Sequence, residues 1–369
     1  MSSRKQTRLH RMAGALFAVV LALTIVATPA AQAIESVPAA GSRLEARSLV
    51  PIGRTAGIKM YAGGVIVTEF SDVQTSSGTV CPAKAAGLQP GDLITQVDGV
   101  TVTTADGLVK AINAKREAVE LTVKRGAQQR TCHLTPAVES GSGRRKIGAF
   151  VRDSLAGIGT ITFYDPASGV FGALGHGISE GETGILMPLA SGSLIASTIT
   201  GVQRGERGTP GSLIGSFDLS SDAGTLHGNL DTGLFGVLRK EELYPELLSA
   251  APIPVGTAAE VQPGAAVILA NVSGEQVQAY DIEIVRILSR DSETKNLYLR
   301  VTDPALLDAT GGIVQGMSGS PILQNGKLIG AVTHVLVSDP TCGYGILIEN
   351  MLNTAGSDAT SRSALLNAA

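Results

Sequence analysis

Short apolar stretches separated by glycine-rich turns dominate the sequence from residue 147 to about residue 351. Short apolar stretches bounded by turn residues are the pattern of strands rather than of helices. The stretches occupy residues 158–164, 169–174, 196–202, 266–272, 281–288 and 296–301. Residues 241–248 are the one segment here with a helical pattern. The pattern predicts a domain made mainly of short antiparallel strands that close into β-barrels.

A different pattern of mixed strands and helices occupies residues 51–137. The predicted order is strand 65–70, helical turn 82–88, strand 93–97, amphipathic helix 105–115 and strands 119–123 and 129–134. The run A-K-A-A-G-L-Q-P-G-D-L-I-T-Q-V-D-G-V within it closely resembles bacterial PDZ domains. The resemblance implies a groove beside the helix that binds an extended peptide as an added strand.

In this resemblance the carboxylate-binding loop of the PDZ domain falls on Gly57, Ile58, Lys59 and Met60. Backbone amides of that loop would receive the end of the peptide. The alternative is a module that only packs against its neighbour.

The N-terminal residues have the pattern of an export signal. Four basic side chains between residues 4 and 11 precede an apolar run at 13–26 and the small-residue site Ala31-Gln32-Ala33. We predict a signal peptide or signal anchor at 1–33, a lead-in segment at 34–50, the PDZ domain at 51–137 and a linker at 138–146. The β-rich domain then covers 147–355, and 356–369 forms a flexible tail. The basic linker is read as a solvated tether open to proteolysis.

Composition narrows the possible partners. The 369 residues carry a net charge of −3 and no Trp, so nothing indicates nucleic-acid binding. The three cysteines, Cys81, Cys132 and Cys342, are too widely spaced for a metal motif and allow at most one disulfide. We predict neither a metal nor a cofactor.

The clearest chemical motif is G-G-I-V-Q-G-M-S-G-S-P, which places Ser318 in a glycine-framed turn ahead of a β-hairpin turned by Asn325-Gly326. Acyl transfer needs an exposed hydroxyl beside amide groups that point at the developing oxyanion. The amides of Gly316 and Ser318 are placed to supply these donors. The alternative is an ordinary glycine-serine turn of a β protein.

A serine nucleophile also needs a base, and three histidines lie in the β-rich domain. His176 sits at a predicted strand end between two glycines, which presents its imidazole at a barrel edge and makes it the better base. His227 is read as a surface turn residue. His334 lies in an apolar run and is read as a core or pocket-wall residue rather than a catalytic one.

Four segments together resemble the SpoIVB peptidases, the family of stage IV sporulation protein B. They are G-A-L-G-H-G-I around His176, V-T-D at Asp303, T-G-G-I-V-Q-G-M-S-G-S-P-I around Ser318 and G-K-L-I-G-A-V-T-H-V with the later D-P-T-C-G-Y-G. The resemblance implies a mainly β chain, a chymotrypsin-like double β-barrel serine protease domain preceded by a small α/β PDZ domain.

By the same resemblance the triad is His176 as base, Asp303 as orienting acid and Ser318 as nucleophile. The residues alone leave the acid open, because Asp165, Asp231 and Asp281 could also reach an imidazole.

The family resemblance also implies a role in sporulation signalling. Such a protease is exported from the forespore into the space between two membranes, where it is released by self-cleavage within its N-terminal segment. It then cuts a membrane-bound regulator of an intramembrane metalloprotease, and a late sigma-factor precursor is processed. Rival hypotheses are a secreted PDZ scaffold or binding protein with a degenerate protease-like domain, and a quality-control protease. The latter is disfavoured because its PDZ domain would follow the protease.

Overall fold

The structure is a computed structural model that describes residues 47–114, 117–181, 183–239, 250–290 and 292–355. The predicted export segment, most of the lead-in segment, the helix at 241–248 and the tail at 356–369 lie outside these residues. No helix within the described ranges is long and apolar enough to cross a membrane.

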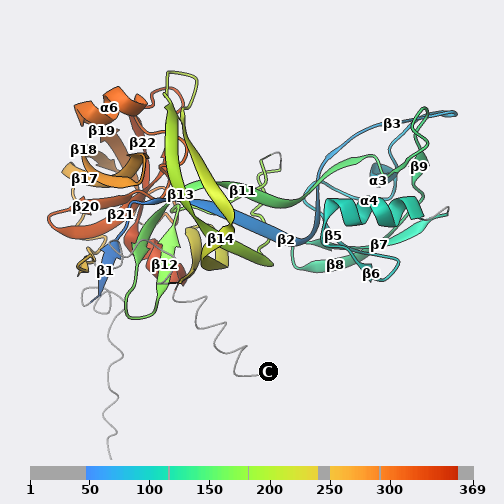
Figure 1. The fold of residues 1–369 in the computed structure, drawn as a ribbon, viewed down its shortest axis with the longest axis horizontal. Helices are drawn as coiled ribbons and strands as arrows, with labels where there is room; N and C mark the ends of the chain where they lie inside the picture. Colours follow the sequence, from blue (N-terminus) through green and yellow to red (C-terminus); the bar gives the residue numbers. More distant parts are fainter. Residues whose placement is uncertain (1–46, 115–116, 182, 240–249, 291, 356–369) are drawn as a thin grey trace, which may run out of the picture. The chain divides into compact units, whose positions relative to one another are not determined.

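A closed barrel of six antiparallel strands forms the C-terminal part of the fold (Figure 1). Around the barrel the strands follow the order β17, β18, β19, β22, β21, β20. Their bounds are β17 Gly264–Ser273, β18 Gln276–Ile287, β19 Leu297–Val301, β20 Pro321–Gln324, β21 Lys327–Val335 and β22 Cys342–Leu347. Inward apolar side chains such as Ile268, Ile284 and Leu299 fill its core. A short helix, α6 (Pro304–Thr310), follows β19.

A second ring of strands forms the N-terminal barrel. Strand pairing runs β11, β12, β15, β14, β13, β2, and β2 then pairs with β11, which joins the two ends of the run. The bounds are β2 Thr55–Phe70, β11 Ala149–Tyr164, β12 Val170–Ala173, β13 Ser191–Gln203, β14 Ser212–Leu230 and β15 Gly233–Leu238. Strands β1 (Ser48–Pro51) and β16 (Ile253–Pro254) extend this sheet beyond β11. The predicted double β-barrel is confirmed.

The PDZ module, residues 71–148, is inserted between β2 and β11 (Figure 1). The two strands are each 16 residues long and pair with one another from Thr55 opposite Thr160 to Phe70 opposite Ala149. The elements of the module are β3 Val73–Thr75, β4 Gly78–Val80, α3 Pro82–Ala85, β5 Leu93–Val97, β6 Val100–Thr101, α4 Ala105–Ala114, β7 Val119–Arg125, β8 Gln128–Leu134, β9 Ala137–Val138 and β10 Arg145–Lys146. Its apolar core lies beneath α4 and also includes Val65 and Val67 of β2, which pairs with β5 at Val65 and Ile66.

The placement of Gly57, Ile58, Lys59 and Met60 in a PDZ loop is corrected by this topology. These residues lie inside β2, where they pair with β11 on one side and β13 on the other. Their backbone groups are therefore used within the N-terminal barrel. A Cβ added to Gly57 would lie 3.0 Å from the Phe217 ring, so the glycine allows close packing rather than a flexible turn.

The linker expected at 138–146 is also more ordered than a solvated tether. Its ends pair as β9 and β10, and Glu139 accepts hydrogen bonds from Ser142 and Lys146 across the intervening turn. The Arg145 backbone exchanges two hydrogen bonds with the Asn113 side chain on α4. The segment is thus a hairpin held against the PDZ helix.

This topology predicts how the chain tolerates truncation. A chain cut to residues 147–355 lacks β1 and β2, so we expect it not to fold, because buried residues such as Leu49 and Met60 would be missing from the core. Phe70 and Ala149 are directly paired, so a two-residue Asn-Gly turn can replace residues 71–148 and join the two strands. We expect this chain to fold as a double barrel of lower stability. Thermal unfolding followed by circular dichroism compares the two chains. A cooperative transition in the 147–355 chain would contradict the assignment of β1 and β2 to the core of the protease domain.

Candidate active site

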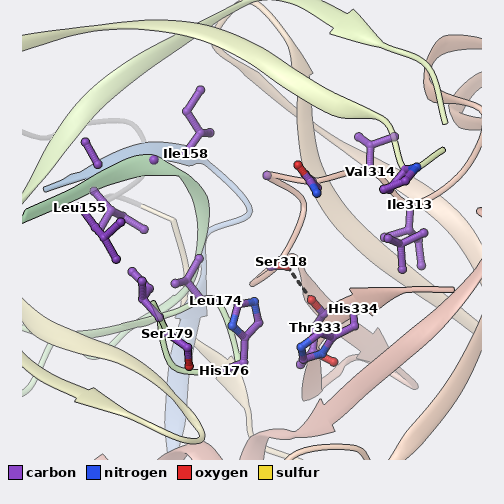
Figure 2. A pocket seen from close by; sticks show the side chains of 18 of the residues that line it. Leu155, Ile158, Leu174, His176, Ser179, Ile313, Val314, Ser318, Thr333 and His334 are labelled. Atoms are coloured by element: carbon purple, nitrogen blue, oxygen red, sulfur yellow. Dashed lines mark hydrogen bonds between the residues drawn. The ribbon is translucent and has the colours of Figure 1, made fainter. Parts of the chain in front are cut away.

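One cavity of about 500 Å³ brings together the Ser318 hydroxyl, His176 and His334 (Figure 2). Ser318 comes from the turn before β20, His176 from the loop after β12, and His334 from the end of β21. The cavity is lined from both barrels, because Leu155 and Ile158 of β11 also face it. Two of the three residues of the predicted triad therefore share one site.

The turn that carries Ser318 is fixed by its own backbone and by the opposite barrel. Gly316 and Gly319 both have φ of +98°, a conformation that favours glycine. Thr160 of β11 donates from its N–H to the Ser318 carbonyl (2.9 Å) and from its hydroxyl to the Gly316 carbonyl (2.7 Å). A Cβ on Gly319 would overlap the Thr160 carbonyl oxygen. The glycine thus permits the close contact between the barrels that positions the serine.

The two predicted oxyanion donors remain uncommitted. Among the described residues, no hydrogen bond has the N–H of Gly316 or Ser318 as its donor, whereas the neighbouring Met317, Gly319 and Ser320 amides all bind backbone carbonyls. Two free amides beside a serine hydroxyl can together stabilise a developing oxyanion.

The Ser318 hydroxyl donates to the carbonyl of Thr333 at 2.5 Å in this arrangement. Thr333 in turn donates from its hydroxyl to the Tyr344 carbonyl on β22. The hydroxyl proton of Ser318 is therefore engaged by β21, and this hydrogen bond must be released before the proton can pass to an imidazole.

His176 follows two residues in the left-handed region, Leu174 (φ +68°) and Gly175 (φ +70°), which turn the chain away from β12. Its Nδ1 lies 2.9 Å from the Gly177 carbonyl, a contact that suits an Nδ1–H donor and leaves Nε2 as the acceptor. Burial lowers the pKa of His176 below its usual 6.5, although the Gly177 contact partly opposes this shift. A neutral imidazole with a free Nε2 is the form that a general base needs.

Asn229, which the sequence analysis did not single out, holds the loop that follows His176. This buried side chain on β14 accepts from the Ile178 N–H (2.8 Å) and donates to the carbonyls of Ile178 (2.8 Å) and Met187 (2.9 Å). Both ends of the loop are thereby fixed to the barrel. No motif marks an asparagine that acts through loop backbone alone.

His334 packs directly against His176, with ring centroids 4.7 Å apart and planes tilted by 36°. A register shift in the pairing of β21 with β22, between Val332 and His334, accompanies this placement. The Nδ1 of His334 is buried and has no hydrogen-bond partner within the described part of the chain. Burial, followed by the charges of His176 and Lys295, lowers the pKa of His334 to about 4. The predicted wall residue therefore touches the proposed base itself.

Asp303 lies elsewhere, at the N-terminus of α6. Its carboxylate accepts from the N–H groups of Ala305 (2.8 Å), Leu306 (3.1 Å) and Asp281 (3.3 Å), and it is not among the residues that line the cavity. This is the geometry of a helix cap. Within the described part of the chain no hydrogen bond joins Asp303 to His176, so its role as orienting acid stays a prediction.

Asp165 and Asp231, two of the other candidates for the orienting acid, lie in defined contacts. Asp165 binds Arg47 at 2.8 Å. The backbone carbonyl of Asp231 accepts from the Gly177 N–H at 3.2 Å, which places the Asp231 turn beside the histidine loop. His227 lies within β14 rather than in the turn expected for it.

A second cavity, of about 270 Å³, lies beside α4 in the PDZ module. Leu108, Val109 and Ile112 of α4 form one side, and residues 146–151 form the other. Gly148 there has φ of +79°, directly before the start of β11. This groove, rather than residues 57–60, has the strand-and-helix arrangement expected for a PDZ peptide site.

The site contains no evident metal centre. No group of three or more His, Cys, Asp or Glu side chains in the described ranges is arranged to hold a metal ion. Cys81, Cys132 and Cys342 are free thiols.

The low pKa of His334 predicts acid-dependent stability. Between pH 6.5 and about 4, the unfolded chain binds a proton that the folded protein excludes, so stability falls as the pH is lowered through this window. We expect His334→Phe to lose less stability than wild type between pH 7 and pH 4.5. Urea unfolding midpoints at the two pH values measure the difference. His133→Asn, at an exposed histidine, is the control and should behave like wild type. Identical pH dependence in all three proteins would contradict the prediction.

Parts of the chain are similar to known proteins. A PDZ domain model matches residues 75–125. The PDZ domain of the SdrC-like protein of Listeria monocytogenes aligns at 24% identity over 24% of this chain and 87% of its own, with a TM-score of 0.20. The active form of the Rv3671c protease of M. tuberculosis aligns at 15% identity over 54% of this chain and 72% of its own, with a TM-score of 0.30.

Comparison with curated protein sequences gives no match. The family model described as SpoIVB peptidase S55, however, matches residues 143–352, which is more than half of the chain. This chain, a serine peptidase with a PDZ domain, belongs to the SpoIVB peptidase S55 family.

Proposed function

We propose that the chain is an exported serine endopeptidase in which Ser318 attacks the scissile carbonyl and His176 is the general base. The observation that carries this proposal is the single cavity that holds the Ser318 hydroxyl, a neutral His176 and the Gly316 and Ser318 amides. After leaving the Thr333 carbonyl, the serine hydroxyl would give its proton to His176 Nε2. The two amides would bind the resulting oxyanion.

The proposed biological role is the one carried by the family. The peptidase would act in sporulation signalling, in the space between the forespore and mother-cell membranes, anchored there before release. Its substrates would be its own N-terminal segment and a membrane-associated regulator of an intramembrane metalloprotease. Cleavage would activate processing of a late sigma-factor precursor. Membership of the SpoIVB peptidase S55 family is the support for this assignment.

The PDZ module would bind an extended peptide in the groove between α4 and the start of β11. Val109 is 51% exposed and Phe150 is 60% exposed, so two apolar side chains at this groove stand open to a ligand. An added strand would pair with β11 on the edge opposite β2. A substrate segment or the protein's own N-terminal segment would fit this mode of binding.

A PDZ scaffold with a degenerate protease-like domain is the competing function. It requires that the serine, the base and the oxyanion donors no longer lie together in one site. The glycine-framed serine turn, the uncommitted amides and the shared cavity favour the peptidase.

The first test is Ser318→Ala. We expect the variant to fold, with a stability loss of about 1 kcal/mol from the lost hydrogen bond to Thr333, and to lose both peptidase activity and labelling by a fluorophosphonate probe. Ser320→Ala is a matched control, because the Ser320 hydroxyl lies two residues away, is buried and has no partner in the described structure. It should label like wild type. Unchanged turnover in folded Ser318→Ala would exclude the proposed nucleophile.

A pair of Asp303 variants separates the two roles of that residue. Asparagine caps helices about as well as aspartate, so Asp303→Asn should keep wild-type stability, whereas Asp303→Ala should lose about 1 kcal/mol. If Asp303 orients His176, activity in Asp303→Asn falls by roughly ten-thousand-fold, which is the result we expect from the family resemblance.

Urea unfolding and peptide hydrolysis are measured on both Asp303 variants. Near-wild-type hydrolysis by Asp303→Asn would restrict the residue to capping. Asp231, next to the histidine loop, would then be the next carboxylate to test.

A further inference from the structure

The cavity around Ser318 has two apolar walls, one from each side of the serine (Figure 2). The first wall is formed by Ile313 and Val314, which precede the serine turn, and by Val335 at the end of β21, which packs against the same core cluster as these two residues. The second is formed by Leu155 and Ile158 of β11, on the other side of the serine in Figure 2, and by Ile178 of the histidine loop, which packs against the same core cluster as Leu155.

No Asp, Glu, Lys or Arg side chain lines this cavity within the described part of the chain. Its only ionisable groups are the imidazoles of His176 and His334, whose lowered pKa values keep both neutral near pH 7. A charged substrate side chain placed against either wall would lose water without gaining a partner of opposite charge. An apolar side chain gains from the same desolvation.

The chemistry of acyl transfer assigns one wall to each side of the scissile bond. As the bond forms between Ser318 Oγ and the carbonyl carbon, the oxyanion faces the Gly316 amide, so the acyl-side residue lies near Ile313, Val314 and Val335. When the C–N bond breaks, His176 returns the proton taken from Ser318 to the leaving amine. The leaving-side residue therefore lies near His176 and the wall of Leu155, Ile158 and Ile178.

We propose that this peptidase selects bonds with an uncharged apolar side chain on both sides, the acyl-side residue binding the Ile313–Val314–Val335 wall and the leaving-side residue binding the Leu155–Ile158–Ile178 wall. The proposal rests on the peptidase function and names the substrate class of that site.

The test uses internally quenched peptides that carry Leu, Val, Lys or Glu at each of the two positions. For the wild-type chain we expect kcat/KM to be at least roughly tenfold higher with Leu or Val than with Lys or Glu at either position, the scale on which apolar pockets discriminate. Equal or faster cleavage beside Lys or Glu would overturn the proposal. Labelling of Ser318 by the fluorophosphonate probe is measured in parallel.

Two substitutions test the assignment of the walls, and both are at partly exposed positions. Val335→Asp should raise the ratio of Lys to Leu cleavage at the acyl side by roughly tenfold or more and leave the leaving-side preference unchanged. Leu155→Asp should raise the same ratio at the leaving side and leave the acyl-side preference unchanged. Val100→Asp, at a 66% exposed valine in the PDZ module, is the control. A shift at the wrong side would refute the assignment of the walls.

The outcomes also separate this inference from the proposed function. Loss of both labelling and cleavage in wild type would mean that the peptidase function fails. Labelling with a preference for charged residues would reject the apolar walls alone. A variant that does not fold is recognised by its missing label, and the wild-type peptide series then decides.

Discussion

The antiparallel pairing of β2 with β11 is the interaction on which the rest of the structure depends. It closes the N-terminal barrel, because it joins the two ends of a run of six strands. It also sets where the PDZ module enters the chain, since the strands continue as a pair to Phe70 and Ala149. Finally it holds Leu155 and Ile158 at the wall of the cavity that contains Ser318 and His176.

Ser318 depends on β11 through a second set of contacts. Ser318 belongs to the C-terminal barrel, but its turn is positioned by two hydrogen bonds from Thr160 in the other barrel. Gly319 permits that approach because a side chain there would collide with β11. The geometry of the serine thus belongs to the junction of the barrels, and neither barrel specifies it alone.

Local sequence signals were sufficient for the parts of the site that are fixed by local backbone. The glycines around Ser318 and His176 marked two turns, and the structure places both residues in one cavity. The helix and turns of the PDZ module were marked in the same way, by glycine-containing turns, alternation and an amphipathic pattern.

Long-range pairing was not visible in the sequence. Residues 57–60 pair on both sides with strands about 100 and 135 residues further along the chain. No local sequence signal shows this pairing, so the glycine at position 57 was interpreted as part of a loop. The contact of His334 with His176 and the loop contacts of Asn229 also arise only from packing. Asp303 shows a related difficulty, because one carboxylate after a strand fits a helix cap as well as a triad.

The shared strand gives the PDZ module a mechanical connection to the active site. A module on a single flexible linker can reorient without changing the enzyme to which it is tethered. Here the connection is a two-stranded ribbon, and only three residues lie between Val151 at the PDZ groove and Leu155 at the wall of the Ser318 cavity. Register shifts between Phe150 and Val151 and between Arg152 and Ser154 lie within or next to this short stretch. Bulges bend and twist a strand locally, so the points at which this ribbon departs from regular pairing lie next to Leu155 at the wall of the cavity that contains Ser318.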